Sequence, residues 1–146
     1  MTGRRHNPHF RKILVGYDGS AQSDKAVDVA LSLAECVDAT VLVFAIARPP
    51  EPSTSAELGA MLDDAREHYE EAFKKILDKA RGRDLTVTTD MAVGHPAEQI
   101  IHRAEKDGID LIVLGRRGRS QIARMMLGSV SERVLRYAHC PVMVVH

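Results

Sequence analysis

The sequence predicts an α/β domain with an open, mostly parallel five-stranded sheet and helices on both faces. Five short apolar runs alternate with four segments of helical periodicity, which is typical of parallel strands joined by helical crossovers. Four of the runs are continuously apolar, as in strands buried on both faces, whereas one alternates between apolar and polar residues. A length of 146 residues, with 45% hydrophobic and 27% charged residues, fits a single globular domain.

The first strand is predicted over residues 11–17, and the first helix begins at Ser20, whose hydroxyl can cap a helix. Polar residues spaced by three and four mark the exposed face of that helix. Its buried face is predicted to carry Ala26, Val29, Ala30, Leu33 and Ala34. The second strand follows over residues 40–47.

A proline-rich loop is predicted over residues 48–53, because proline lacks a backbone donor and restricts φ. Thr54 and Glu57 then form a capping-box pattern at the start of the second helix. An apolar stripe at helical spacing continues for about six turns and ends at Gly82. We expect the whole stripe to pack against the core: Leu58, Met61, Leu62, Ala65, Tyr69, Ala72, Phe73, Ile76, Leu77 and Ala80.

Residues 85–93 alternate in polarity, which predicts a half-exposed strand at an edge of the sheet. Pro96 suits the first position of the third helix. A fourth strand is predicted over residues 109–114, and a last helix begins at Gly128-Ser129. The final strand is predicted over residues 141–145.

A ligand site is predicted beyond the carboxyl ends of the strands, where strand order reverses in sheets of this type. Gly115 and Gly118 follow the fourth strand, and Gly128-Ser129 opens a helix. Glycines let backbone amides approach an anion, while a helix start adds unpaired amides, a dipole and here a hydroxyl. Asp18, at the end of the first strand, is placed to accept hydrogen bonds from a ribose or a base. Together these features indicate a nucleotide site.

Charge distribution supports a small anionic ligand. The net formal charge is zero, whereas a general nucleic-acid binder is basic overall. Four arginines and no acid lie between Gly115 and Gly128. His139 and Cys140 have no partner pair at metal-ligand spacing, so we predict no protein metal site.

Several segments resemble the universal stress protein family. They are Ile13 to Ser20 (ILVGYDGS), Gly94-His95-Pro96, the G-x2-G-x9-G-S pattern from Gly115 to Ser129, and the ending from Cys140 to Val145. The resemblance covers nearly the whole chain from about residue 11. It implies the ATP-binding branch, a Rossmann-like sheet of order 3-2-1-4-5, an ATP site between strands one and four, and homodimers formed through Pro141 to Val145.

The resemblance also implies roles for residues at matching positions. Those assigned to the nucleotide are Gly16, Tyr17, Asp18, Ile46, Leu114, Gly115, Arg117, Gly118, Gly128, Ser129, Val130 and Ser131. Asp18 would bind the adenosine part, and Ser129 with the phosphates would supply some of the oxygens for Mg²⁺. Arg116 stands where the family more often has a small residue. For Arg116 and Arg117, a phosphate contact and a solvated surface position stay open as equal alternatives.

We therefore predict an ATP-binding stress-response module that acts as a dimeric, nucleotide-dependent switch. Two alternatives stay open: a slow ATPase, or a scaffold that binds AMP, cyclic AMP or no nucleotide. No residue stands out as a general base, so no catalytic residue is assigned. We expect residues 1–10 to form a flexible basic arm and residues 11–146 a single domain. We expect a cytoplasmic protein, because the basic start is not followed by the apolar segment of a secretion signal. No run is long enough to cross a bilayer.

Overall fold

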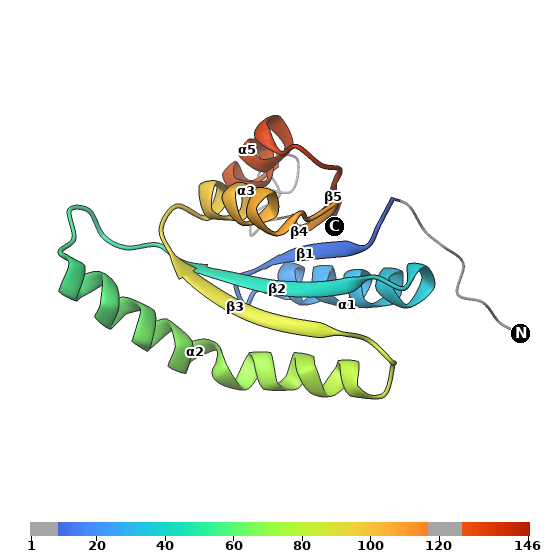
Figure 1. Cartoon of the computed structure of the whole chain (residues 1–146). Coiled ribbons are helices and arrows are strands. Elements are labelled where there is room, and N and C mark those ends of the chain that lie inside the picture. The colour runs from blue at the N-terminus through green and yellow to red at the C-terminus, as the bar shows by residue number, and fades with distance from the viewer. Residues whose placement is uncertain (1–8, 117–126) are drawn as a thin grey trace, which may run out of the picture.

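The computed structural model describes residues 9–116 and 127–146, and these form a five-stranded sheet with four helices (Figure 1). The strands are β1 (Lys12–Tyr17), β2 (Thr40–Ala47), β3 (Val87–Val93), β4 (Leu111–Gly115) and β5 (Val142–Val145). The helices are α1 (Ala21–Val37), α2 (Ser55–Arg81), α3 (Pro96–Asp107) and α5 (Ser129–Tyr137). All neighbouring strands are parallel, in the order β3-β2-β1-β4-β5. The predicted fold class and the strand order implied by the resemblance are confirmed.

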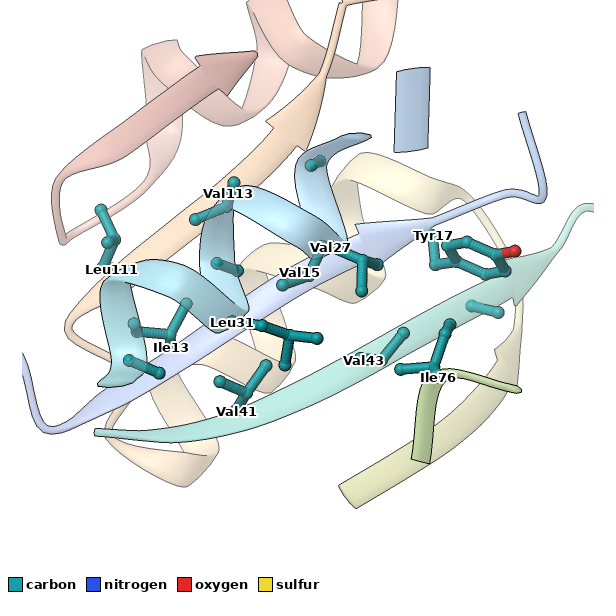
Figure 2. Packing of buried hydrophobic residues seen from close by; sticks show 14 of the residues in the cluster. Ile13, Val15, Tyr17, Val27, Leu31, Val41, Val43, Ile76, Leu111 and Val113 are labelled. Atoms are coloured by element: carbon teal, nitrogen blue, oxygen red, sulfur yellow. The ribbon is translucent and has the colours of Figure 1, made fainter. Parts of the chain in front are cut away.

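Helices cover both faces of the sheet: α1 and α2 lie on one face, and α3 and α5 lie on the other (Figure 1). Successive side chains of β1 explain the two layers, because Ile13 and Val15 pack with α1 while Leu14 packs with α3. Figure 2 shows the closely packed apolar side chains on the α1 face. The central strands are therefore buried on both sides, as their continuous apolarity predicted.

Strand order reverses between β1 and β4. The chain runs outward from β1 to β2 and β3, and then returns through α3 to β4 on the opposite side of β1. Connections that leave neighbouring strands in opposite directions open a crevice at their carboxyl ends. The fold thus creates the predicted place for a ligand.

The buried face of α1 differs from the prediction by part of a turn. Ser20 caps the helix as expected, its hydroxyl accepting a hydrogen bond from the backbone N–H of Ser23 at 3.2 Å. Val27 and Leu31 are fully buried, whereas the expected Val29 and Leu33 are only half-buried. The predicted alanine row (Ala26, Ala30 and Ala34) is buried. Val27 and Leu31, on one side of this row, are more deeply buried than Val29 and Leu33 on its other side.

The α2 stripe packs on the core from Leu62 onward, but not at its N-terminal end. Thr54 caps the helix, as predicted, by accepting from the N–H of Glu57 at 3.2 Å. Phe73, Ile76 and Ala80 are buried, but Leu58 is exposed. Figure 1 shows the reason: the N-terminal end of α2 extends past the strands beside it. The prediction that the whole stripe is buried is therefore wrong, because the helix is longer than the sheet it covers. Nowhere in the described ranges is a helix both long and apolar enough to cross a membrane.

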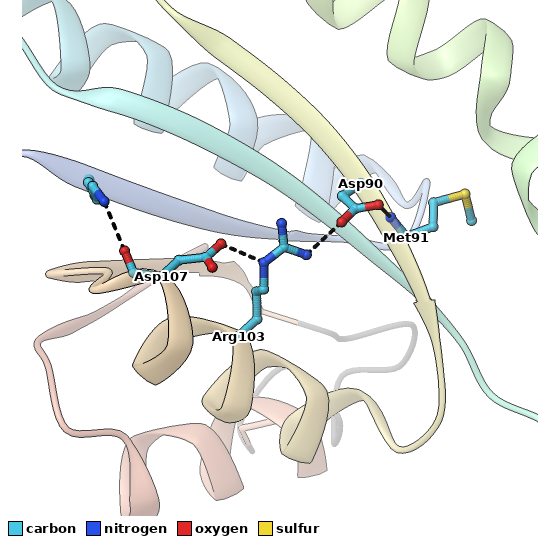
Figure 3. Close-up of polar contacts among 5 residues, drawn as sticks. Asp90, Met91, Arg103 and Asp107 are labelled. Carbon is cyan, nitrogen blue, oxygen red and sulfur yellow. Dashed lines mark hydrogen bonds and ion pairs between the residues drawn. The ribbon is translucent and has the colours of Figure 1, made fainter.

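An ion-pair network attaches α3 to the edge strand β3 (Figure 3). The Arg103 guanidinium donates to Asp90 at 2.6 Å and to Asp107 at 2.5 Å, and it lies 5.1 Å from the centre of the Phe44 ring. Burial acts to raise the pKa of Asp90, but hydrogen bonds from Arg103 and the Met91 backbone outweigh it and lower that pKa. Asp90, on the polar side of β3, is therefore bound by Arg103 of α3. β3 lies at an edge of the sheet, as predicted.

Candidate functional site

A pocket lies where β1 and β4 end, at the reversal of strand order. It is lined by Gly16, Tyr17, Asp18, Ser20, Ser23, Ile46, Pro96, Ile100, Leu114, Gly115, Gly128, Val130 and Ser131. These residues come from β1, β2, β4 and from the first turns of three helices. The pocket thus joins parts of the chain that are far apart in sequence.

One side of the pocket is apolar. Ile46 at the end of β2, Ile100 of α3 and Leu114 of β4 contribute branched side chains, while Pro96 and Val130 complete the surface. Pockets for small molecules are typically built in this way, with an apolar lining and a few polar groups that fix orientation. This side is suited to a flat, weakly polar group such as a purine base.

The turn after β1 supplies a carboxylate and two hydroxyls. Oδ1 of Asp18 accepts from the N–H of Ser20 at 2.9 Å, and the Asp18 N–H donates to the Ser23 hydroxyl at 3.3 Å. The Ser23 hydroxyl in turn donates to the Ser20 carbonyl at 3.0 Å. These bonds hold the carboxylate of Asp18 in one orientation at the pocket, as a hydrogen-bond acceptor for ligand hydroxyls requires.

Gly115 allows α1 to approach the end of β4. A Cβ at this position would lie 2.5 Å from the backbone carbon and oxygen of Gln22 and 2.9 Å from the Ser23 nitrogen. Only glycine therefore permits the observed distance between β4 and the first turn of α1. This close approach brings the Ser20 and Ser23 hydroxyls to the pocket.

The first turn of α5 borders the pocket, and no side chain of the described residues caps its backbone amides. Its N-cap is Gly128, which has no side chain to accept hydrogen bonds from them. Ser131, two residues into the helix after Ser129, is only 4% exposed and lines the pocket. Uncapped amides, the positive helix dipole and a buried hydroxyl make this end of the pocket suitable for an anion.

Buried polar side chains in the described ranges occur at this pocket. Ser23 and Ser131 are the buried polar residues found there, and both are pocket residues. Burying a hydroxyl is unfavourable unless it has a hydrogen-bond partner. The Ser23 hydroxyl has its partners within the turn after β1, so it helps to fix that side of the pocket.

Tyr17 lines the pocket and also packs on α2, on the face of the sheet that α1 and α2 cover. Its ring contacts Tyr69 and Phe73 of α2, with ring centres 5.9 Å and 6.1 Å away, and its hydroxyl donates to Asp24 at 2.9 Å. Burial and the adjacent Asp24 raise the pKa of Tyr17, so the phenol stays neutral. The anchored ring fixes the backbone immediately before Asp18.

The structure brings most of the expected site residues together. Those lining the pocket are Gly16, Tyr17, Asp18, Ile46, Leu114, Gly115, Gly128, Val130 and Ser131. Ser129 lines a neighbouring groove instead. Arg117 and Gly118 lie outside the described residues. The guanidinium of Arg116 is beside His146, with 3.3 Å between Nη1 and Nδ1, and Arg116 is not a pocket residue.

Four pocket residues were not anticipated: Ser20, Ser23, Pro96 and Ile100. Ser20 and Pro96 were noted in the sequence only as helix-start residues. Helices that start at the carboxyl ends of strands place their first turns at the crevice, and this rule could have identified both. Nothing local marks Ser23 or Ile100, because their positions depend on how α1 and α3 pack on the sheet.

His95, His139 and Cys140 have structural partners outside the pocket. His95 Nε2 lies 2.9 Å from Glu51, and His139 Nε2 lies 2.8 Å from Glu105. Cys140 packs against the α3 face, and burial raises the pKa of its thiol. Among the described residues, no three His, Cys, Asp or Glu side chains are grouped so as to hold a metal ion.

This fold and pocket define a doubly wound α/β domain with a ligand site at the topological switch point. The sequence profile of the universal stress protein family matches residues 9–146. The universal stress protein YxiE of Bacillus subtilis is 36% identical over 146 residues, covering 93% of this chain and 99% of that protein. The universal stress protein MJ0531 of Methanocaldococcus jannaschii is 37% identical over 139 residues, covering 93% and 82% of the two chains. The chain belongs to the universal stress protein family.

Solved structures agree with this assignment. The universal stress protein UspA from Lactobacillus plantarum has the same fold, with a TM-score of 0.82, 24% identity, and coverage of 96% of this chain and 100% of that one. A universal stress protein in complex with cAMP has a TM-score of 0.71 and 27% identity, covering 94% of this chain and 98% of that one. Nucleotide binding is therefore a property found within the family.

Proposed function

We propose that this chain is an adenine-nucleotide-binding module, that ATP is its ligand, and that it acts as a dimeric switch in the cytoplasmic stress response. The observation that carries the proposal is the pocket at the ends of β1 and β4. There, an apolar wall, the oriented Asp18 carboxylate and the uncapped first turn of α5 lie together. These are the three groups that a base, a ribose and a phosphate need.

Each group has a separate task in this proposal. The base packs against Ile46 and Leu114, and the ribose hydroxyls donate to Asp18. The phosphates accept from the amides that follow Gly128 and from the Ser131 hydroxyl. Arg117 and Gly118 join the phosphate contacts in the pattern implied by the family. Mg²⁺ bound with ATP takes its oxygens from the phosphates and from a hydroxyl such as that of Ser129.

Cyclic AMP is the second candidate ligand. It is favoured by the complex of a 27% identical family member with cAMP. The two candidates differ in charge and length at the phosphate end, so competition among ATP, AMP and cyclic AMP separates them. The carboxylate of Asp18 at the pocket is assigned to ligand binding. A slow ATPase activity is the other alternative, and it is tested by following phosphate release.

Dimers are proposed to form through β5, one of the two edge strands. The carbonyls of Pro141 and Val145 accept from the N–H groups of Ile112 in β4 and of Arg116 directly after it. The N–H and C=O groups of successive residues in a strand point to opposite sides, so those of Val144 point away from β4. An unpaired apolar edge is an aggregation risk, and pairing with a second copy across a two-fold axis removes it.

The dimer is tested by light scattering of the wild type and of Val144→Pro. Proline removes an outward donor without removing a bond to β4, so it is tolerated at an edge but prevents pairing there. We expect a dimeric wild type and a monomeric variant of unchanged circular dichroism. A monomeric wild type at micromolar concentration would refute the dimer.

The nucleotide proposal is tested first by denaturing the purified protein and identifying any released small molecule by mass spectrometry. Calorimetric titration with ATP, AMP and cyclic AMP follows, for the wild type and for Asp18→Asn. The asparagine oxygen can still accept from the Ser20 N–H, so the turn is retained while the charge is lost. We expect about tenfold or greater loss of affinity, as for removal of a charged hydrogen-bonding partner.

The matched control is Asp28→Asn, which removes an exposed carboxylate from the same helix region. Its nucleotide affinity should equal that of the wild type. If no adenine nucleotide is released and none binds at millimolar concentration, the proposal is wrong.

A further inference from the structure

A second groove adjoins the nucleotide pocket. It is lined by Arg48, His95, Pro96, Ala97, Glu98, Ser129, Val130, Glu132, Arg133, Arg136 and Tyr137. Pro96 and Val130 belong to both linings, so the two hollows meet along these residues. A ligand that leaves the pocket past Pro96 and Val130 therefore enters the groove.

The groove adds space beside the pocket: it holds about 310 Å³, whereas the pocket encloses about 80 Å³. Sites for small molecules usually measure about 300–1,000 Å³. The groove is thus large enough to take a substantial second part of a ligand held in the pocket.

Three guanidinium groups lie along the groove. Arg133 is paired with Glu98 at 3.1 Å, and Arg136 with Glu132 at 3.4 Å, but all four side chains are more than half exposed. Ion pairs this exposed contribute little stability, so a phosphate can replace a carboxylate as partner. Arg48, at the end of β2, has no partner among the described residues. The groove therefore offers cations to a polyphosphate chain.

The same groove holds an aromatic platform and carboxylates. Tyr137 is 55% exposed at the end of α5, and the Arg133 guanidinium lies 6.0 Å from its ring centre. An exposed aromatic ring beside a guanidinium is a surface on which a nucleobase can stack. Glu98 and Glu132 are placed to accept from ribose hydroxyls once phosphate has taken their arginines.

We propose that the groove is a second nucleoside subsite. The full ligand class is then an adenine nucleotide that carries another nucleoside through its phosphate chain, such as a dinucleoside polyphosphate. The first adenosine occupies the pocket, the polyphosphate crosses Pro96 and Val130 toward Arg48 and Arg136, and the second base stacks on Tyr137. This inference rests on the proposed nucleotide-binding function and extends it from one nucleoside to two.

The experiment compares three ligands by calorimetric titration of the full chain: ATP, adenosine tetraphosphate and diadenosine tetraphosphate. The last two carry the same number of phosphates, and only the last has a second nucleoside. We expect diadenosine tetraphosphate to bind about tenfold more tightly than either of the others, as one stacked base provides.

Two variants locate the gain. Tyr137→Ala removes the platform, and Arg48→Ala removes the cation without a described partner. Tyr137→Ala should lower only the affinity for diadenosine tetraphosphate, toward that for adenosine tetraphosphate. Arg48→Ala should lower the affinity for both tetraphosphate ligands, because it removes a partner of the polyphosphate chain. The matched control is Arg81→Ala, an exposed arginine of α2 on the other face of the sheet, which should change none of the three affinities.

The outcomes are distinct. If adenosine tetraphosphate binds as tightly as diadenosine tetraphosphate, the second nucleoside makes no contact and the proposal is overturned. If ATP binds but neither longer ligand is favoured, the subsite is again overturned while the nucleotide-binding function stands. If none of the three ligands binds, the nucleotide-binding function itself fails, and the subsite fails with it.

Discussion

The two faces of the sheet serve different purposes. On one face, the long helices α1 and α2, with 17 and 27 residues, pack on buried side chains from all five strands. On the other face, α3 and α5 have 12 and 9 residues, and their buried contacts come from β1, β2 and β4. The pocket lies at the strand ends, bordered by the starts of α1, α3 and α5, and the groove is lined mainly by α3 and α5. The first face therefore mainly stabilises the fold, whereas the helices of the second also line the pocket and the groove.

The largest expected effect separates the two faces directly. Leu31→Ala empties a fully buried position on the α1 face, which should lower the free energy of unfolding by about 2–5 kcal/mol. Because Leu31 is not a pocket residue, the folded variant should bind ATP as the wild type does. Urea denaturation followed by circular dichroism measures the first quantity, and calorimetric titration measures the second.

The matched variant on the second face is Ile100→Ala, at a residue that is 2% exposed and lines the pocket. It should lower both the stability and the affinity for ATP. If Leu31→Ala reduced affinity as much as Ile100→Ala, the division between the two faces would be wrong.

A smaller but more specific effect is expected where the α1 face meets the pocket. Gly115→Ala places a Cβ against the Gln22 backbone, and we expect a loss of about 1–3 kcal/mol together with weaker nucleotide binding. The control is Gly59→Ala in the exposed half of α2, where no atom lies within 4 Å of the new Cβ. There, alanine should raise stability by about 0.5–1 kcal/mol. Equal effects at the two glycines, measured by thermal unfolding, would contradict the close-approach argument.

The ion-pair network on the α3 face should contribute a modest, pH-dependent stability. The folded-state pKa of Asp90 is lowered, so its contribution is complete above the ordinary aspartate pKa of about 3.9 and is lost as the pH falls through the lower folded-state value. Asp90→Asn should therefore cost up to about 1 kcal/mol near pH 7, because the side chain is 40% exposed. The difference from the wild type should shrink in acid.

Urea denaturation at a series of pH values tests this prediction. Asp28→Asn is the control, since its pair with Lys79 is more exposed on both sides. A constant difference between wild type and Asp90→Asn down to the acid range would show that Arg103 does not stabilise the ionised carboxylate.

The smallest effect is expected at the end of α2 that extends past the sheet. Leu58→Ala should change the free energy of unfolding by less than about 0.5 kcal/mol, because Leu58 is exposed. Ile76→Ala, on the same stripe but over the sheet, should cost about 2–5 kcal/mol. Similar losses from the two variants would mean that the extended end is packed after all.

Local patterns in the sequence predicted features that depend on neighbouring residues. The caps at Ser20 and Thr54 were predicted because a hydroxyl bonds to an amide three residues on. The half-exposed character of β3 followed from alternation along a single strand. The position of Asp18 at the crevice also followed, since a residue at the carboxyl end of a central strand has few other places to lie.

Other features required distances between segments that are remote in the chain. The sequence could not distinguish Leu31 from Leu33 as the sheet-facing residue, because both lie beside the alanine row of α1. It could not show that Ser131 rather than Ser129 lines the pocket, since this depends on the rotation of α5 over β4.

The sequence by itself determined the α/β class, the five strands, the helix starts and the approximate place of the pocket, because periodicity and local hydrogen bonding depend on consecutive residues. Family motifs added the strand order. Only the tertiary structure decided where α2 leaves the sheet, which serines reach the pocket, and that Arg48 shares a groove with Tyr137. These features depend on how helices of particular length pack against strands encoded far away, and no local pattern contains that information.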